Sequence, residues 1–226
     1  MIPKVIHYCW FGRGEKPKLA LKCIESWRKF LPDYEIKEWN EDNFDVNMIP
    51  YTAEAYKAKK YAFVSDYARM WVLYHYGGLY FDTDVEVVAP LDDIIAKGAF
   101  MGIESCDHKI LNVSPGLGIG VEAKHIFYQE IMHRYEQENL QCEGYIVPFT
   151  SKAMIEHGIK PINELQNVAG IWIYPQDFFN PYDYINDRLI KTNNTRTIHW
   201  YGASWLSTCG RLKLLIGKKI RKYLLR

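Results

Sequence analysis

The sequence predicts an α/β fold, and three segments within its first forty residues carry the prediction. Lys4–Trp10 is apolar and rich in β-forming residues, which indicates a buried strand entered through Pro3. Lys18–Phe30 places apolar residues at helical spacing and stops before Pro32. Tyr34–Trp39 alternates between apolar and polar residues as a strand does. The order strand, helix, strand within so short a stretch is typical of an α/β layer with a parallel sheet.

The next elements lead to an acidic turn. Thr52–Tyr76 has the pattern of a helix, in one piece or broken near Tyr61. Gly77-Gly78 ends this helix because glycine accepts the left-handed conformation found at helix ends. Strands on either side of Asp82-Thr83-Asp84 place this triplet on a turn. The remaining expected elements are strands Leu79–Phe81 and Val85–Val88, a glycine-rich loop Ser114–Gly120, a helix His125–Asn139, strands Ile171–Tyr174 and Thr197–Trp200, and a terminal helix Arg211–Arg226.

Length and charge divide the chain into a body and a tail. Its 226 residues, 48% of them apolar, suit one domain with a sizeable core and a small appendage. We expect a body of residues 1–210, with 21 basic and 27 acidic side chains, and a tail of residues 211–226, with seven basic side chains and no acidic one. The net charge of +1 argues against a nucleic-acid-binding protein that works by bulk electrostatics.

Cysteine usage and the N-terminus indicate the compartment. The five cysteines form no C-x-x-C pair, which excludes a zinc site of that kind and a disulfide framework. The N-terminus lacks the segments of a signal peptide, and no stretch approaches the ~18 uninterrupted apolar residues of a membrane-spanning helix. We therefore expect a cytoplasmic protein.

The acidic pair Asp82 and Asp84 is the first candidate for chemistry. Two carboxylates one residue apart after a buried strand repel each other, so at least one would have a raised pKa unless a cation lies between them. Oxygen ligands favour Mg²⁺ or Mn²⁺, which usually share their coordination with substrate phosphates. A pair of solvated turn aspartates is the alternative, because a lone Asp-x-Asp occurs often by chance.

A second charged pair lies just upstream. Asp66 and Arg69 are three residues apart and therefore face the same side of one helix turn. The helix runs toward Asp82, which would bring both side chains near the acidic turn. There Arg69 could hold a phosphate oxygen or a sugar hydroxyl, and Asp66 a sugar hydroxyl. An internal salt bridge that only fastens the helix is an equal alternative on these residues.

These segments together resemble the sugar-binding region of the family 32 glycosyltransferases. Those Asp-x-Asp enzymes include polysaccharide-building and mannosyl- or galactosyl-transferring members, and the large glucosylating toxins are similar at a greater distance. Three segments carry the resemblance: Pro3-Lys4-Val5-Ile6-His7-(x)₂-Trp10-Phe11-Gly12, Ser65-Asp66-(x)₂-Arg69…Leu73-Tyr74-(x)₂-Gly77-Gly78-Leu79-Tyr80-x-Asp82-x-Asp84, and Ile198-His199-Trp200-(x)₃-Ser204-Trp205.

The resemblance implies a GT-A fold, a Rossmann-like mixed sheet flanked by helices, with a nucleotide-sugar at the carboxyl ends of its strands. Trp10 would stack on the nucleobase, and a core tryptophan is the alternative. His199 would approach the metal, and a satisfied core histidine is the alternative. The loop Ser114–Gly120 is expected to line the donor-sugar or acceptor pocket. The resemblance implies donor-binding roles for Trp10, Tyr8, Asp66, Arg69, Asn112, Ser204 and Trp205. It implies metal-binding roles for Asp82, Asp84, His199 and Ser204. It implies catalytic roles for Asp82, Asp84, Arg69 and Asp66.

The resemblance also implies a reaction. A glycosyltransferase moves a sugar, here from a UDP-linked donor, to a glycan or lipid-linked saccharide in polysaccharide biosynthesis. Mn²⁺ or Mg²⁺ on Asp84, with Asp82 on the metal or the ribose, would neutralise the leaving diphosphate, and Arg69 and Trp205 would hold it. Retention of configuration is expected, through a front-face reaction. A metal-dependent phosphohydrolase and a non-catalytic nucleotide-sugar-binding protein are the alternatives.

The tail adds a hypothesis about membranes. Its apolar residues fall on one helical stripe and its basic residues lie largely away from that stripe. Such a helix can lie in the interface of an anionic membrane, so we expect peripheral contact through residues 211–226 at the inner face of the membrane. The alternative is a terminal helix that packs its stripe on the protein body.

Overall fold

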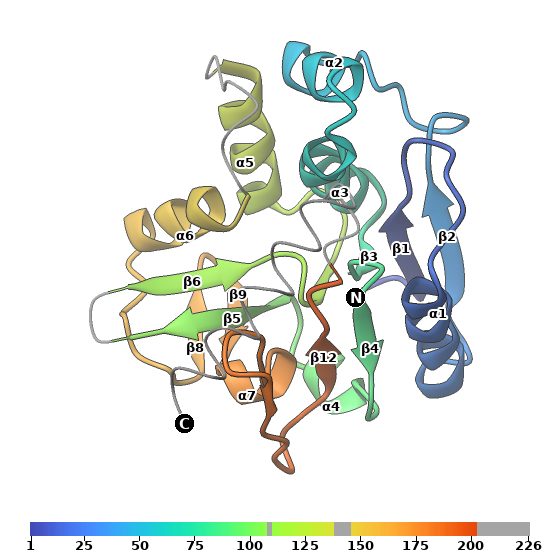
Figure 1. Cartoon of the computed structure of the whole chain (residues 1–226). Helices are drawn as coiled ribbons and strands as arrows, with labels where there is room; N and C mark the ends of the chain where they lie inside the picture. Colours follow the sequence, from blue (N-terminus) through green and yellow to red (C-terminus); the bar gives the residue numbers. More distant parts are fainter. Residues whose placement is uncertain (108–109, 138–145, 203–226) are drawn as a thin grey trace.

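A computed structural model describes residues 1–107, 110–137 and 146–202 (Figure 1). The expected tail helix and the predicted site residues Ser204 and Trp205 lie outside these residues. The strands of the described part are β1 Val5–Cys9, β2 Glu35–Trp39, β3 Gly78–Tyr80, β4 Val85–Val87, β5 Phe100–Cys106, β6 Leu111–Ser114, β7 Ile119–Val121, β8 Gln166–Val168, β9 Ile171–Tyr174, β10 Tyr182–Asp183, β11 Arg188–Leu189 and β12 Thr197–His199.

The main sheet is mixed, as the predicted fold class requires. Among the described residues it has eight strands in the order β2-β1-β3-β7-β5-β9-β8, and β6 pairs with β5 outside that path. β1 runs parallel to β2 and β3, and β5 runs parallel to β9. The other pairs, β3 with β7, β5 with β7, β5 with β6 and β8 with β9, are antiparallel.

Helices cover both faces of this sheet because alternate strand residues feed two separate cores. In β3 and just after it, Leu79 and Phe81 belong to one core, whereas Tyr80 belongs to the other. One core takes residues from α1, α4 and α7, and the second from α2, α3, α5 and α6. Figure 1 shows α3 and α5 side by side above the sheet, and α1 beside β1 and β4. The helices are α1 Lys18–Phe30, α2 Pro50–Lys57, α3 Tyr61–Tyr76, α4 Asp92–Ile95, α5 Ile126–Gln137, α6 Ile146–Glu156 and α7 Gln176–Phe179.

The helical segment expected over Thr52–Tyr76 takes the second of its two expected forms, a break near Tyr61 that separates α2 from α3. The first begins at Pro50, earlier than predicted, because proline suits the first helical position. Lys59, in the left-handed conformation with φ 57°, separates the two helices. At its far end α3 stops at Gly77, as its glycine predicts, and Gly77 has a φ of 64°. After the break α3 begins at Tyr61, and its first turns place Arg69 3.1 Å from Asp82 on the acidic turn.

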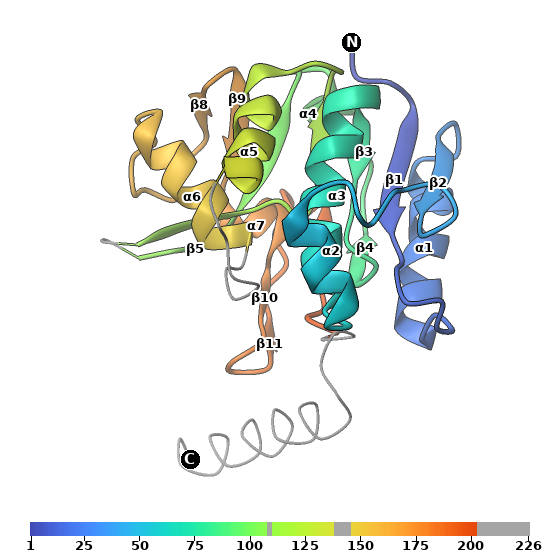
Figure 2. The same ribbon diagram turned by 90° about the horizontal axis from the view of Figure 1, so that it is seen from above.

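A late segment of the chain returns to this turn. Strand β12 pairs antiparallel with β4, and His199 lies opposite Val85. This pairing brings residues near 200 beside Asp84, more than a hundred positions earlier in the sequence. Between α7 and β12, the hairpin of β10 and β11 projects from the body, as Figure 2 shows.

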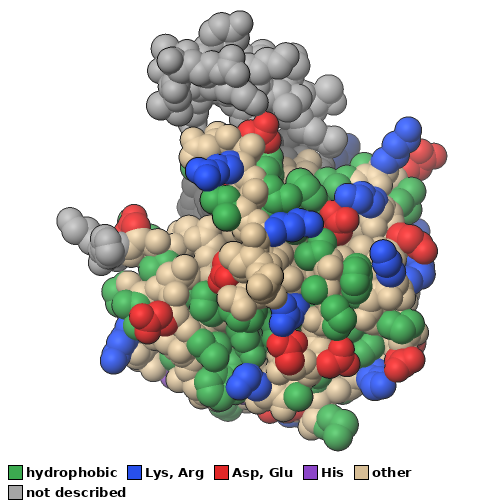
Figure 3. Space-filling model, turned by 90° about the horizontal axis from the view of Figure 1, so that it is seen from below, with side chains coloured by type: hydrophobic (Ala, Val, Ile, Leu, Met, Phe, Trp, Pro, Cys, Tyr) green, Lys and Arg blue, Asp and Glu red, His purple; other side chains and the backbone are tan. Residues whose placement is uncertain are grey.

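The surface carries charges of both signs. On the face shown in Figure 3, Lys and Arg side chains alternate with Asp and Glu side chains around apolar groups. Cys9, Cys23 and Cys106 are free thiols in the described part of the chain. Within that part, no helix has both the length and the apolar character needed to cross a membrane.

His7 joins three elements and must be neutral to do so. Its side chain is buried in β1, and the indole Nε1–H of Trp39 donates a hydrogen bond of 3.0 Å to its Nδ1. Because that nitrogen accepts, the proton resides on Nε2, which donates to the carbonyl oxygen of Gly77 at 2.9 Å. Burial lowers the pKa of His7 to about 4, although the Gly77 hydrogen bond favours the charged form. A second proton would face the Trp39 N–H, so the neutral imidazole holds β1, β2 and the end of α3 together.

We expect His7 to make the fold sensitive to acid. Its pKa of about 4 in the folded chain lies below the ordinary 6.5 of the unfolded chain, so its contribution is complete above pH 6.5 and is lost as pH falls toward 4. The loss should approach about 3 kcal/mol of unfolding free energy. Urea unfolding at a series of pH values measures it.

The matched variant is His7→Gln, which offers a donor and an acceptor but does not titrate. Between pH 6.5 and 4 its stability should fall less steeply than that of the wild type. Parallel curves for the two proteins would contradict the assignment to His7.

Candidate functional site

A pocket of about 530 Å³ opens where β1 and β3, two parallel neighbours, reach their carboxyl ends. Its volume lies in the range of small-molecule sites. The walls come from six parts of the chain: the end of β1 and the loop after it (Cys9, Trp10, Phe11, Gly12, Gly14, Glu15 and Pro17), the start of α3 (Tyr61, Ala62, Phe63, Ser65, Asp66 and Arg69), the segment from β3 to the acidic turn (Tyr80, Asp82, Thr83 and Asp84), strands β5 and β6 (Glu104 and Ser114), the start of α6 (Ile146 and Val147), and β12 with its continuation (His199 and Tyr201).

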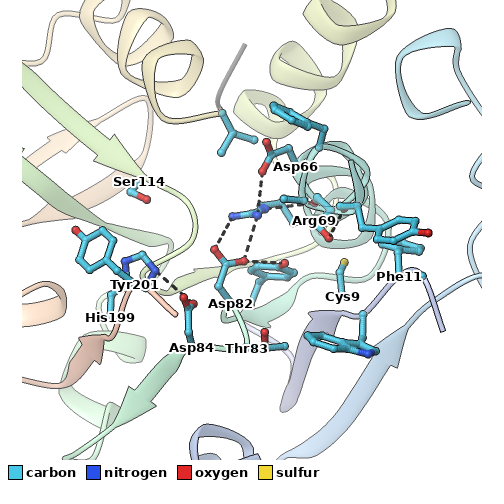
Figure 4. Close-up of a pocket in the computed structure, with 18 of the residues that line it drawn as sticks. Cys9, Phe11, Asp66, Arg69, Asp82, Thr83, Asp84, Ser114, His199 and Tyr201 are labelled. Carbon is cyan, nitrogen blue, oxygen red and sulfur yellow. Dashed lines mark hydrogen bonds and ion pairs between the residues drawn. The ribbon is translucent and has the colours of Figure 1, made fainter. Parts of the chain in front are cut away.

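Arg69 lies between two carboxylates. Its Nη2 is 3.0 Å from Asp66 and 3.1 Å from Asp82 Oδ1, and its Nη1 donates to Asp82 Oδ2 at 3.4 Å. The guanidinium also lies 4.9 Å from the centre of the Tyr80 ring, and the Tyr80 hydroxyl donates to Asp82 at 3.1 Å. The salt bridge between Asp66 and Arg69, one of the two alternatives left open by the sequence, is therefore present, and it extends to the acidic turn. Figure 4 shows this chain of contacts.

Asp84 turns to a different partner. Its Oδ1 is 3.3 Å from Nε2 of His199, and its Oδ2 accepts a 2.8 Å hydrogen bond from the backbone N–H of Gly202. The backbone adds a further link, because the N–H of Trp200 donates to the carbonyl oxygen of Asp84. The two aspartates thus line one pocket but serve opposite sides of it, Asp82 toward α3 and Asp84 toward β12 (Figure 4).

Burial and neighbouring charges separate the pKa values of these acids. Burial raises the pKa of Asp66 to about 7 against the attraction of Arg69. It also raises the pKa of Asp82, and the charge of Asp84 adds to that rise. For Asp84 burial acts in the same direction, but the charge and hydrogen bond of His199 outweigh it and lower the pKa. The repulsion between the two acids that was expected from the sequence thus contributes to the raised pKa of Asp82, but burial is the larger cause.

Trp10 lines the pocket and is only partly buried. Its indole Nε1–H donates to the carbonyl oxygen of Gly14 at 2.7 Å, which fixes the ring within the loop after β1. The ammonium of Lys16 lies 5.8 Å from the ring centre. The indole therefore packs on the edge of a core and also faces the cavity. Its position is compatible both with stacking on a nucleobase and with a structural role in the core.

Two predicted donor residues lie elsewhere. Tyr8 is buried, donates its hydroxyl hydrogen bond to Glu38 and packs edge-on against Trp27 at 5.6 Å between ring centres. Its strand position directs it into the core beside α1. Asn112 lies on β6 and donates to the hydroxyl of Ser105 at 2.9 Å. Neither residue lines the pocket, so we correct the expectation and leave both out of the proposed donor site.

Sequence reasoning missed three pocket residues of note: Glu104, Tyr201 and Tyr61. Glu104 lies on β5, which was not predicted even though its run from Phe100 to Ile103 has the apolar character of a buried strand. Tyr201 directly follows the predicted closing strand. Within the glycine-rich loop predicted over Ser114–Gly120, Ser114 lines the pocket.

Comparison with known proteins gives this pocket a context. Residues 17–101 match a protein-family model described as "Glycosyltransferase sugar-binding region containing DXD motif", and this range includes Asp66, Arg69, Asp82 and Asp84. Inositol phosphoceramide mannosyltransferase 1 of Schizosaccharomyces pombe is 29% identical over 111 residues, which are 44% of this chain and 33% of that protein. Inositol phosphoceramide mannosyltransferase 2 of the same yeast is 27% identical over 217 residues, 91% of this chain and 58% of that protein.

A glycosyltransferase of Acanthamoeba polyphaga mimivirus is similar over more of its length. It is 26% identical over 208 residues, which are 85% of this chain and 82% of that protein. The chain therefore spans most of the viral protein but only a third to three fifths of the two yeast enzymes. The chain is therefore similar, over part of its length, to glycosyltransferases, the class expected from the sequence.

Two solved structures share the fold. PaToxG glycosyltransferase superposes with a TM-score of 0.52 at 18% identity, covering 69% of each chain. A glycosyltransferase involved in the glycosylation of the major capsid of PBCV-1 gives a TM-score of 0.52 at 10% identity, covering 96% of this chain and all of that one. Together with the mixed sheet, these likenesses confirm the GT-A fold.

Gly116 offers a test of how closely Asp82 is held. A Cβ atom at this position would lie 2.2 Å from Asp82 Oδ2 and 3.3 Å from Arg69 Nη1. We expect Gly116→Ala to turn the Asp82 carboxylate away from Arg69. The nucleotide-sugar binding expected from the sequence should then weaken by about tenfold or more, the scale of one lost charged hydrogen bond. Calorimetric titration measures the binding, and thermal unfolding shows whether the fold persists. Unchanged binding in a folded variant would show that the site tolerates a displaced Asp82.

Proposed function

We propose that this chain transfers a hexose from a nucleoside-diphosphate sugar to a hydroxyl group of a glycan or lipid-linked saccharide. The observation that carries the proposal is the division of the acidic pair within one pocket. Asp82, Asp66 and Arg69 form a rigid set that suits sugar hydroxyls, whereas Asp84 and His199 form a set that suits a cation with its diphosphate. The names of the two yeast relatives favour mannose as the transferred sugar. We also propose that the reaction is a front-face reaction that retains the configuration at the anomeric carbon. Proton NMR of the product measures that configuration.

The metal side fits Mn²⁺ or Mg²⁺ shared with substrate. No group of three or more His, Cys, Asp or Glu side chains among the described residues is arranged to hold a metal ion. Asp84 supplies a carboxylate and His199 an imidazole, and both ions commonly complete such a partial set with phosphate and water oxygens. In the described residues the buried Nδ1 of His199 has no hydrogen-bond partner, so one nitrogen of the ring is available for a further contact. When bound, the cation would neutralise the diphosphate as a Lewis acid.

The sugar side is preorganised by Arg69. Because the guanidinium holds Asp66 and Asp82 in fixed positions, both carboxylates can accept hydrogen bonds from sugar hydroxyls without first reorganising. Arg69 itself is buried, with 4% of its surface exposed, so its charge acts mainly through the two acids. These residues bind and orient the sugar.

The nucleobase side is aromatic. We propose that Trp10 stacks on the base of the donor, a contact worth ~1–3 kcal/mol. Its ring is fixed by the Gly14 carbonyl and faces the cavity beside Phe11, Tyr61 and Phe63.

A thermal-shift screen of nucleotide-sugars with Mn²⁺ tests the proposed function. A ligand that binds only the native state stabilises it by mass action, so the donor among UDP-glucose, UDP-galactose, UDP-N-acetylglucosamine and GDP-mannose should raise Tm. Trp10→Ala should lose most of this shift while its own Tm changes little. A variant that unfolds, or that binds the donor normally, would assign Trp10 to the core. Release of inorganic phosphate or sugar phosphate without any acceptor would instead favour a phosphohydrolase.

The Asp84 role predicts metal dependence. We expect chelation to abolish turnover of the donor found in that screen and Mn²⁺ to restore it. Asp84→Asn should remove turnover and leave a folded protein, because its backbone contacts with Trp200 remain. Donor consumption over time, with circular dichroism as the control for folding, measures both. Full turnover in excess chelator would rule out the metal.

A further inference from the structure

Glu104 is placed in the pocket by an irregularity in the sheet. Along the pairing of β5 with β6, Ile103 lies opposite Val113 and Ser105 lies opposite Asn112, so Glu104 has no partner on β6. Such a β-bulge re-aims the side chain of the extra residue and is common beside active sites. The backbone carbonyl of Glu104 accepts a 2.9 Å hydrogen bond from Nδ2 of Asn180. The bulge is thus a fixed feature of the fold.

The carboxylate of Glu104 is also held from one side. The hydroxyl of Tyr201 donates to its Oε1 at 3.2 Å, and Nδ2 of Asn180 donates to that hydroxyl at 2.7 Å. Asn180 is buried, and Tyr201 is in the left-handed conformation with φ 49°, an uncommon one for a non-glycine residue. The Tyr201 ring is packed against the His199 ring at 4.0 Å between centres. Asn180 therefore fixes both the backbone of the bulge and the group that orients its carboxylate.

Glu104 differs from the three aspartates that line the pocket. Asp66 and Asp82 pair with Arg69, and Asp84 pairs with His199, but Glu104 forms no ion pair with any residue that the structure describes. Within the same part of the chain, its Oε2 has no hydrogen-bond partner. Burial raises the pKa of Glu104, against the nearby charge of His199. A carboxylate held in this way with a free oxygen is a strong acceptor for a hydroxyl group.

The position of this residue points to the acceptor substrate. Figure 4 shows Asp66 and Arg69 on one side of the acidic pair, and Ser114, His199 and Tyr201 on the other. The proposed donor contacts occupy the first side, Asp82, Asp84 and the loop after β1. Glu104, bound to Tyr201, belongs to the second side, which has no role in donor binding apart from His199.

Resting on the proposed function, we propose that Glu104 binds the attacking hydroxyl group of the acceptor saccharide through Oε2. Tyr201 and Asn180 are positioning residues that act through Glu104. The acceptor would enter along the wall formed by β5 and β6, and its hydroxyl would be held toward the sugar that Asp66, Arg69 and Asp82 orient. Glu104 accepts a hydrogen bond in this role and forms no bond to the sugar.

The test separates acceptor binding from donor binding. The donor is the nucleotide-sugar that gives the largest thermal shift, and the acceptor is the best of the methyl α- and β-glycosides of mannose, galactose and glucose for the wild-type protein. Glu104→Gln should raise the acceptor KM by about tenfold or more, the equivalent of ~1.4 kcal/mol, and leave the donor KM within about twofold. Tyr201→Phe should raise the acceptor KM by a smaller factor without changing the donor KM. The matched control Glu164→Gln, at an exposed position, should change neither constant.

Each other outcome overturns the proposal. An unchanged acceptor KM in Glu104→Gln, or an equal rise in both KM values, would assign Glu104 to the fold alone. A wild-type protein that consumes the donor but transfers to none of the six glycosides would remove the acceptor role and leave the proposed function standing. Failure of every nucleotide-sugar to bind the wild type would overturn the proposed function and this role with it. If Glu104→Gln does not fold, Tyr201→Phe decides the question through the same ratio of KM values.

Discussion

The buried guanidinium of Arg69 is the constraint on which the pocket depends. A charge removed from water costs several kcal/mol unless partners compensate it, so Asp66 and Asp82 must both lie within reach. One of these acids is on the same turn of α3, and the other is on the turn after β3. The ion pairs therefore fix the distance between helix and sheet at the place where the two parallel strands end. The Tyr80 ring beneath the guanidinium restricts it further.

Because Asp82 pairs with Arg69, the second aspartate, Asp84, pairs with a different residue, His199. Asp84 is one residue beyond Thr83, and the chain turns between the two acids, so its carboxylate meets β12 rather than α3. The short Asp-x-Asp segment thereby serves as the boundary between two environments. One is a network of fixed charges around Arg69, and the other is the carboxylate and imidazole pair of Asp84 and His199, which we propose as the cation side.

The sequence predicted those parts of the molecule in which local pattern and structure agree. Lys18–Phe30 is α1 to the residue, because its apolar side chains repeat with the period of a helix and Pro32 follows. Strands β1, β2 and β9 were predicted from their apolar and alternating patterns, and the acidic turn lies between β3 and β4 as expected.

Other elements were not predicted. The antiparallel strands β5 to β7 were missed, as was α6, whose apolar residues follow no clear face. Glu104 was missed because a bulge depends on the register of two strands, which no single segment encodes. Tyr8 was misplaced because its neighbours Cys9 and Trp10 reach the cavity while strand alternation turns Tyr8 into the core.

The pairing of β12 with β4 has a consequence for the time at which the site comes into being. A ribosome adds Asp66, Arg69, Asp82 and Asp84 first, and His199 and Tyr201 follow more than a hundred residues later. Contacts of such wide sequence separation form late, since a long loop must close first. The nascent chain can therefore gather its charged network around Arg69 while Asp84 still lacks its imidazole partner and Glu104 its tyrosine. Completion of the pocket therefore waits until β12 has been made, and a chain that stops short of β12 lacks the His199 and Tyr201 side of the pocket.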